Sequence, residues 1–271
     1  MDESLRICAV IPSYNHSARI QWIVDKLLEN NLDVIMVDDA SDTEHAKILK
    51  AMSSSNSYQD DQVKLVVHNL NQGKGGAVMS GLLYAKAQGY HAALQVDADG
   101  QHNLNDINKM LSLAKENPGA LISGKPVYDD SIPKARLWGR KLTHFWVHVE
   151  TLSLQVQDTM CGFRIYPLQS TCQLISDTNL GKRMDFDIDV MVRLFWRNVP
   201  VVFLPTQVKY PEDGQSHFRA FQDNALITWL HIRLVIGMLI RMPFLIKNKF
   251  KVKSINTVKK SNIESSKHDL S

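Results

Sequence analysis

Cysteine is scarce in this chain of 271 residues, and the three that occur, Cys8, Cys161 and Cys172, form no C-x-x-C pair and no metal-ligand spacing. An odd, widely spaced set gives no basis for a disulfide framework or a zinc site, and it predicts reduced thiols in a cytosolic protein. The N-terminus is acidic before its first apolar run and lacks a small-residue cleavage site, so no signal peptide is expected.

A strong charge of either sign is also lacking, because the formal net charge is only +3. This balance implies no nucleic-acid partner. No uninterrupted apolar run reaches the roughly 20 residues of a spanning helix. The most apolar segment, residues 225–253, is interrupted by His231, Arg233 and Arg241, and lysines follow it. We expect an amphipathic helix on a membrane surface, with a helix packed on the domain and a true span as alternatives.

Short apolar runs rich in β-branched residues alternate with segments of helical spacing over the first hundred residues. Strands are predicted at 6–12, 32–39, 62–68 and 91–97, and helices between them. Such alternation is typical of an α/β fold with a mainly parallel sheet covered by helices on both faces. Ligands bind such sheets beyond the C-terminal strand ends, so the residues following each strand are the candidates for function.

The pattern loosens after residue 118, although further elements are predicted. Residues 132–152 and 186–198 have helical spacing, and 120–124, 161–167 and 199–208 are predicted strands. The chain is therefore divided into a main α/β domain at 1–215, a loop and amphipathic helix at 216–253, and a polar, disordered tail at 254–271.

Two carboxylates end the fourth predicted strand, in the stretch ALQVDADGQH at residues 93–102. Asp97 and Asp99 are two positions apart, so in an extended chain both side chains project to one side. Two acids on one side repel each other and need a cation, and oxygen ligands suit Mg²⁺ or Mn²⁺. Gln101 adds a carbonyl oxygen. The stretch predicts a divalent-metal site that holds a diphosphate; a solvated acidic turn is the alternative.

Two further motifs follow predicted strands. Asp39 ends the second strand, where its carboxylate is positioned to accept hydrogen bonds from a ribose diol or a base, whereas Ser41 and Asp42 are expected to cap the next helix. The run NQGKGG at 71–76 lacks P-loop spacing, but its glycines allow a ligand to approach the backbone. Lys74 is expected either to neutralise a phosphate or to pair with an acid.

Five motifs together resemble one family. AVIPSYNH, VIMVDDASD, NQGKGGAVMSGL, QVDADGQH and DTMCGFRIYP occur in this order at the separations found in inverting family 2 glycosyltransferases of the GT-A fold. The chain most resembles the branch that makes polyprenyl-phosphate sugars, as the dolichyl-phosphate mannose synthase-like enzymes do. The resemblance covers about residues 5–210. It departs from the usual pattern at His16, where Glu is frequent, and at SGKPVY, where Lys125 takes the basic position.

The resemblance implies roles for individual residues. The donor nucleotide sugar would be held by Pro12, Tyr14, Asn15, Asp39 and Asp97, with Lys74 beside them, and the metal by Asp97, Asp99 and Gln101. The implied enzyme is a metal-dependent inverting glycosyltransferase that moves a sugar from a nucleotide sugar to a lipid acceptor, with polyprenyl phosphate as the first candidate. It would be peripheral, on the cytoplasmic face of a membrane. A glycolipid or natural-product hydroxyl as acceptor, and a catalytically silent nucleotide-sugar-binding module, are the alternatives.

The nature of the acceptor decides which further residues are needed. A lipid phosphate is already ionised near pH 7 and requires positive charge, for which Lys125, Arg136, Arg140 and Arg164 are candidates. A hydroxyl acceptor requires a carboxylate base within hydrogen-bond reach. Asp158 is the candidate base, and its alternative role is that of a loop acid that orients Arg164. The residues expected to act in the reaction are therefore Asp99, Asp158 and Arg164.

Overall fold

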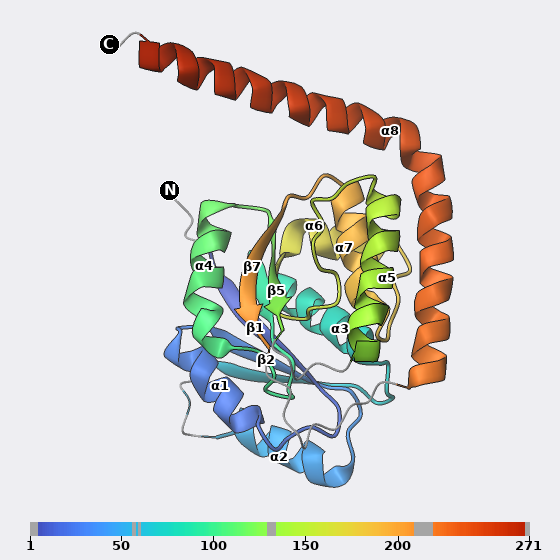
Figure 1. The fold of residues 1–271 in the computed structure, drawn as a ribbon. Coiled ribbons are helices and arrows are strands. Elements are labelled where there is room, and N and C mark those ends of the chain that lie inside the picture. Colours follow the sequence, from blue (N-terminus) through green and yellow to red (C-terminus); the bar gives the residue numbers. More distant parts are fainter. Residues whose placement is uncertain (1–4, 56–57, 59–60, 129–133, 209–218, 269–271) are drawn as a thin grey trace.

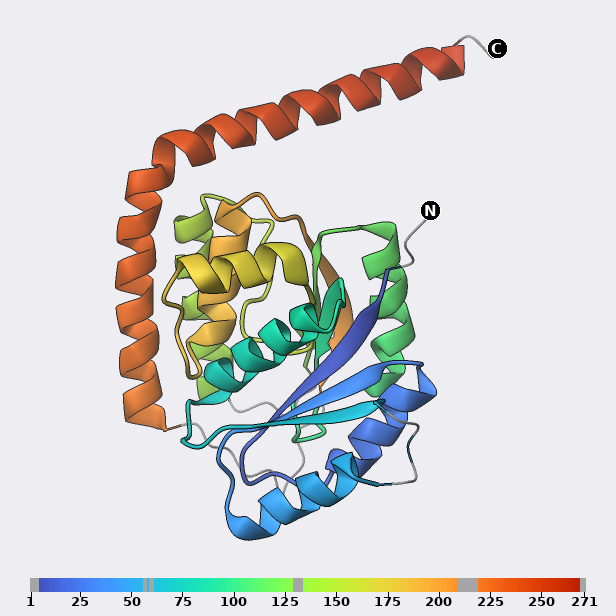
Figure 2. The same ribbon diagram turned by 180° about the vertical axis from the view of Figure 1, so that it is seen from behind.

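A single seven-stranded sheet organises the chain, and helices cover both of its faces (Figures 1 and 2). The structure is a computed structural model. It describes residues 5–55, 58, 61–128, 134–208 and 219–268, and for residues 134–136, 220 and 248–268 it describes the backbone alone. The strand order is β3-β2-β1-β4-β6-β5-β7.

The strands and helices follow one another along the chain with few long connections. The strands are β1 (Ile7–Ser13), β2 (Asp33–Asp38), β3 (Val63–Val67), β4 (Ala92–Gln95), β5 (Leu121–Val127), β6 (Arg164–Pro167) and β7 (Val201–Gln207). The helices are α1 (Ile20–Glu29), α2 (Thr43–Ser53), α3 (Lys74–Ala87), η1 (Leu104–Asp106), α4 (Ile107–Glu116), α5 (Lys134–Thr151), α6 (Leu168–Asp177), α7 (Phe186–Trp196) and α8 (Ala220–His268).

The sheet is mainly parallel, which confirms the predicted fold class. β1 pairs in parallel with β2 and with β4, β2 pairs in parallel with β3, and β5 pairs in parallel with β7. Only β6 among the described strands is antiparallel to its neighbours, β4 and β5. The strand order reverses direction between β1 and β4, and in open α/β sheets ligands bind at such a switch point.

Apolar side chains on both faces of the central strand form two separate cores. Cys8 and Val10 of β1 belong to one core, under α3 and α7, whereas Ala9 and Ile11 belong to the other, under α1 and α4. All four side chains are fully buried. A strand buried on both faces is read as a continuous apolar run, and this is why its position was predictable.

Three features differ from the sequence-based expectations. Helices α4 and α6, which the structure contains, were not predicted from the sequence. Helix α8 continues to His268, through residues 254–268 for which a disordered tail was predicted. No Gly or Pro follows Pro243 to end the helix, and Lys, Ser and Asn are compatible with helical backbone.

The close packing of α3 on β1 requires a glycine in the helix. A Cβ atom at Gly81 would lie 2.3 Å from Cγ1 of Val10, whereas one at Gly139 of α5 would meet nothing within 4 Å. We predict that Gly81→Ala lowers the free energy of unfolding by about 1–3 kcal/mol through overpacking. Gly139→Ala, the matched control, should leave it unchanged or raise it by up to about 1 kcal/mol. Urea unfolding measures both, and equal effects would contradict the packing account.

Candidate active site

The side chains predicted to bind ligand gather beyond the C-terminal ends of β1, β2 and β4. Asp39 follows β2, and Asp97 and Asp99 follow β4, on either side of the central strand β1. The strand order reverses between β1 and β4, and in open α/β sheets ligands bind where the connections after such strands diverge. The fold therefore brings together motifs that are about 60 residues apart in the sequence.

Asp97 is held by three polar side chains. Its Oδ2 atom accepts a hydrogen bond from Lys74 Nζ at 2.8 Å and lies 3.3 Å from Nε2 of His102, while Oδ1 accepts one from Gln95 Nε2 at 3.1 Å. Burial alone would raise the pKa of Asp97, but the charge of Lys74 and the nearby His102 outweigh it and hold the pKa well below its usual range. The carboxylate is therefore ionised and available to a cation.

Lys74 lies between two carboxylates, so the structure shows the pairing with acids that the sequence left open. Its Nζ atom is 2.8 Å from Asp97 and 3.3 Å from Oδ2 of Asp187, which lies in the first turn of α7. Burial alone would lower the pKa of Lys74, but the charges of Asp187 and Asp97 raise it well above its ordinary value. A cation held by two carboxylates neutralises only part of the charge on Asp97.

Gly162 packs directly against this ion cluster. A Cβ atom there would lie 2.7 Å from Oδ2 of Asp97, 2.7 Å from Nε2 of Gln95 and 2.9 Å from Nζ of Lys74. Any larger residue would force these side chains apart. Neither Gly162 nor Asp187 was singled out from the sequence, although three acids in the otherwise apolar run at 185–192 could have pointed to buried carboxylates.

Asp99 and Gln101 lie on the half-buried turn that follows Asp97. The Oδ1 atom of Asp99 accepts a hydrogen bond from the backbone N–H of Gln101 at 2.9 Å, and Gly100 between them has a left-handed φ of 68°. The described residues contain no group of three or more His, Cys, Asp or Glu side chains that could hold a metal. The predicted ligand set is two carboxylates and one amide, whose oxygens fit Mg²⁺ or Mn²⁺ that shares the remaining positions with water and phosphate.

Asp39 organises the glycine-rich loop. Its Oδ1 atom accepts hydrogen bonds from His68 Nδ1 at 2.7 Å and from the Gln72 N–H at 2.8 Å, and Oδ2 accepts one from the Gly73 N–H at 2.8 Å. Nε2 of His68 in turn lies 2.9 Å from Oγ of Ser80 on α3. These bonds fix the loop that ends at Lys74. The observed role of Asp39 is to hold this loop, and its role in binding a nucleoside stays a prediction.

The first motif is tied to the turn after β2. The backbone N–H of Asn15 donates to Ser41 Oγ at 3.0 Å, and Oδ1 of Asn15 accepts from the Asp42 N–H at 2.8 Å. Asp42 caps α2 as predicted, whereas Ser41 makes this contact with Asn15 instead of capping the helix. Pro12 is buried in β1, and Tyr14 is exposed beside this turn.

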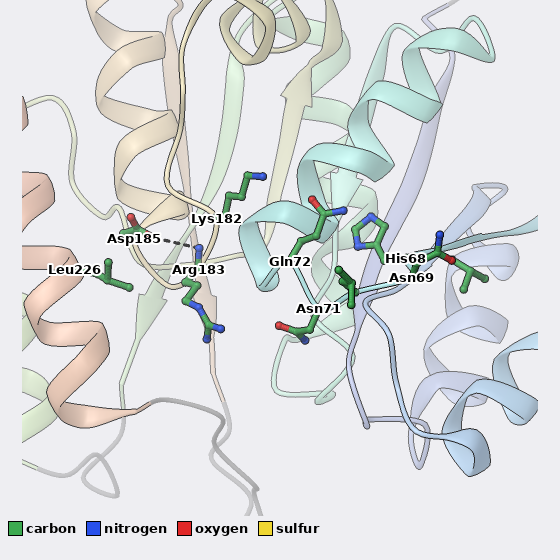
Figure 3. Close-up of a pocket in the computed structure, with 10 residues that line it drawn as sticks. His68, Asn69, Asn71, Gln72, Lys182, Arg183, Asp185 and Leu226 are labelled. Atoms are coloured by element: carbon green, nitrogen blue, oxygen red, sulfur yellow. Dashed lines mark hydrogen bonds between the residues drawn. The ribbon is translucent and has the colours of Figure 1, made fainter.

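A pocket of about 890 Å³ adjoins the loop on the side of β3. Figure 3 shows His68, Asn69, Asn71 and Gln72 on one side of it and Lys182, Arg183, Asp185 and Leu226 on the other. His68 lines the pocket and also bonds Asp39, so the pocket and the loop share a wall. The pocket lies outside the Asp97–Lys74–Asp187 cluster.

Asp158 is buried and fully engaged. Its Oδ1 atom accepts hydrogen bonds from the N–H groups of Met160 and Cys161 at 2.9 and 2.8 Å, and Oδ2 pairs with Arg140 and lies 3.3 Å from Nε2 of His144. Burial alone would raise the pKa of Asp158, but the nearby His144 and the charge of Arg140 hold it well below its usual range. The acid thus joins α5 to the loop before Gly162.

The remaining predicted residues lie at different depths. Arg164 is fully buried and donates to the backbone oxygen of Asp187 at 2.7 Å, so it supports the ion cluster from below. Lys125 is exposed on β5 and donates to Gln157 Oε1 at 3.0 Å. Arg136 lies in the first turn of α5, and its side chain is outside the described part of the chain.

Comparisons with known proteins agree on one family. The family model described as Glycosyl transferase family 2 matches residues 8–170. The chain is 25% identical over 218 residues to a dolichyl-phosphate beta-glucosyltransferase of Dictyostelium discoideum, covering 73% of this chain and 65% of that protein. It is 26% identical over 218 residues to a UDP-N-acetylglucosamine–dolichyl-phosphate N-acetylglucosaminyltransferase of Methanococcus voltae, covering 76% of this chain and 86% of that one.

The fold is also similar to a solved structure. Glucosyl-3-phosphoglycerate synthase from Mycobacterium tuberculosis, in complex with Mn²⁺, UDP-glucose and phosphoglyceric acid, superposes with a TM-score of 0.64 at 13% identity, covering 87% of this chain and 80% of that one. At this identity the similarity concerns the fold alone. This chain spans 65% of the length of the dolichyl-phosphate beta-glucosyltransferases of Dictyostelium discoideum and Homo sapiens.

The ion cluster predicts an effect of Asp187 on metal binding. In Asp187→Asn the whole charge of Lys74 falls on Asp97, so a divalent cation meets a less negative site. We expect the dissociation constant for Mn²⁺ to rise about tenfold, equivalent to about 1.4 kcal/mol. Titration followed by electron paramagnetic resonance of free Mn²⁺ measures this without any turnover.

Asp177→Asn is the matched control for this substitution, since Asp177 is half exposed and pairs with Arg197 away from the cluster. It removes the same charge and should leave the Mn²⁺ affinity unchanged. An unchanged affinity in Asp187→Asn as well would show that Lys74 does not compete with the metal for Asp97.

Proposed function

The chain belongs to glycosyltransferase family 2, and on that premise we propose that it transfers a sugar from a nucleotide sugar to a polyprenyl phosphate. The observation that carries the proposal is the position of Asp97 and Asp99, beyond the end of β4 and at the switch point of the sheet. Relatives named as dolichyl-phosphate glycosyltransferases support the acceptor class.

The donor diphosphate is proposed to lie over the turn after β4. Asp97, Asp99 and Gln101 would hold Mg²⁺ or Mn²⁺ there, and when bound the ion would act as a Lewis acid that offsets the charge of the departing diphosphate. Lys74 orients Asp97 and keeps it ionised. Asp39 holds the glycine-rich loop, and Pro12, Tyr14 and Asn15 would contact the nucleoside of the donor.

The state of Asp158 favours a phosphate acceptor over a hydroxyl. A general base must take up a proton in the reaction, and one with a pKa far below the working pH does so poorly. Asp158 has such a pKa, and both of its oxygens are engaged by Arg140, His144 and two backbone N–H groups. A lipid phosphate needs no base, because it is ionised near neutral pH. Positive charge from Lys125 and Arg136 would bind it.

Membrane association is proposed to involve α8. Residues Phe221–Lys247 of this helix are long and apolar enough to cross a bilayer by length and composition, with a mean hydropathy of 1.6. One side of the helix nevertheless packs on the domain through Leu230, Leu234 and Met238. A helix with one side in the protein core suits an interfacial position better than a span. The three free cysteines suit the reducing cytoplasmic face.

The function is tested by direct transfer. Purified protein is incubated with Mn²⁺, a panel of nucleotide sugars and a polyprenyl phosphate, and lipid-linked sugar is detected by mass spectrometry. We expect product with at least one donor, none after addition of EDTA, and recovery with Mn²⁺ or Mg²⁺. Asp99→Ala should lower turnover at least about a hundredfold without changing the melting temperature. Normal turnover of Asp99→Ala with metal present would contradict the assignment of Asp99.

The acceptor class is tested with Asp158→Asn. Asparagine keeps an oxygen for the N–H groups of Met160 and Cys161, so turnover with polyprenyl phosphate should fall less than about tenfold, whereas loss of a general base costs about 10²–10⁴-fold. The melting temperature should fall, because Arg140 and His144 lose a charged partner. A hundredfold fall in kcat at an unchanged melting temperature, together with wild-type transfer to polyprenol, would indicate a hydroxyl acceptor.

A further inference from the structure

Helix α5 has an exposed face of large apolar side chains. Trp138 is 71% exposed, Leu142 62%, Phe145 58% and Trp146 37%. Their spacing of i, i+4, i+7 and i+8 places them on one side of the helix. The described contacts of these rings are local: Phe145 and Trp146 meet edge to face at 5.5 Å, and Lys141 lies over Trp138 at 5.4 Å. A contiguous exposed patch of this kind marks an interaction surface.

The opposite face of α5 holds the active-site loop. Arg140 and His144 point inward to Asp158, which bonds the backbone just before Gly162. One helix therefore contacts the catalytic machinery on its inner side and presents aromatic rings on its outer side. Whatever binds the outer face is separated from the site by the thickness of a single helix, about 10 Å.

The exposed faces of α5 and α8 form one continuous surface. The two helices run side by side in both views (Figures 1 and 2), and the buried carboxylate Glu150 of α5 meets Nδ1 of His231 of α8 at 2.7 Å. Trp146 is four residues before Glu150, so its side chain is rotated by about 40° around α5 from that of Glu150. Ile232 follows His231, so its side chain is rotated by about 100° around α8 from that of His231. Both Trp146 and Ile232 are exposed to solvent. The exposed apolar residues of α8 continue with Trp229, Ile236, Leu239 and Ile240.

Charge on this surface is of one sign. Residues 134–149 of α5 and residues 224–247 of α8 contain no Asp or Glu. The basic residues with described side chains on this surface are Lys141 on α5, and Arg233, Arg241 and Lys247 on α8, whereas Arg140 points inward to Asp158. Apolar helices with interfacial tryptophans and adjoining cations complement the acyl chains and anionic headgroups of a bilayer. A polar protein partner would not use this composition.

We propose that α5 and α8 dock together on an anionic lipid bilayer, with the aromatic face of α5 in the headgroup region. This inference rests on the membrane association proposed above and deepens it, since α8 is then only half of the docking surface. Seated in this way, α5 carries the loop at 158–162 to the membrane surface. A lipid phosphate would reach the site without leaving the headgroup layer.

Vesicle binding of a variant with acids in place of two apolar side chains tests the proposal. Trp138→Glu combined with Phe145→Glu places two acids on the outer face of α5 and leaves the inner face intact. Binding to vesicles of phosphatidylcholine mixed with phosphatidylglycerol is measured by sedimentation, without donor or metal. We expect the partition coefficient to fall at least about tenfold. Trp22→Glu on α1, a half-exposed tryptophan on another part of the surface, is the matched control and should bind like the wild type.

Several outcomes would overturn the proposal. Wild-type binding by the double variant would leave α8 as the sole docking element. A wild-type dimer that becomes a monomer in the double variant would make this face a contact between two copies. If the double variant fails to fold, the fluorescence of Trp138 is obtained by subtracting the spectrum of Trp138→Phe from that of the wild type. Brominated lipids should quench this fluorescence when vesicles are bound. Absence of quenching would refute the proposal.

A separate assay keeps this result distinct from the proposed function. In detergent, with a short-chain polyprenyl phosphate, the double variant should transfer sugar at the wild-type rate, because its substitutions face away from the site. Absence of transfer by the wild type would refute the proposed function and leave the vesicle result standing. Loss of vesicle binding with normal transfer in detergent supports docking through α5.

Discussion

The proposed active site depends on a half-buried lysine that is shared between two carboxylates. Lys74 begins α3, Asp97 follows β4, and Asp187 lies in the first turn of α7, so one ammonium group joins three elements on one side of the sheet. Arg164 lies 3.9 Å from Asp187, so two cations and two acids balance one another in this cluster. The negative charge that would attract a divalent ion beside Asp97 therefore comes from Asp99 on the following turn.

The rest of the fold serves to hold this cluster in register. Asp39 and His68 fix the loop before Lys74, Gly162 leaves the space that the lysine and Asp97 occupy, and buried Arg164 supports Asp187 from beneath. Asp39, His68 and Arg164 each contact more than one polar group, and Gly162 is in close contact with the side chains around it. Their positions are therefore set by packing and hydrogen bonding before any ligand arrives.

The first half of the fold was predictable because its signals are local. Strands β1 and β2 are continuous apolar runs. Asp97 and Asp99 follow another apolar run, that of β4, and a buried strand has no structural need of two acids at its end. Strand β6 has four residues, and nothing in so short a segment reveals that it runs antiparallel. Asp187 was missed because its partner Lys74 is 113 residues away, and an acid within an apolar helix looks like part of a solvated face. Ion pairs between residues far apart in the sequence leave no periodic pattern in it, so they cannot be predicted in the way that helices and strands are.

The contact between Glu150 and His231 makes α8 an integral part of the domain. Leu230, Leu234 and Met238 close the core beside it, and Trp196 donates to the backbone oxygen of Glu150 at 2.9 Å. Truncation before residue 225 would strip the imidazole from a fully buried carboxylate and uncover the apolar residues beneath. Loss of the helix would thus unfold part of the domain, so in the proposed membrane-bound enzyme release from the bilayer would have to proceed with the helix still in place.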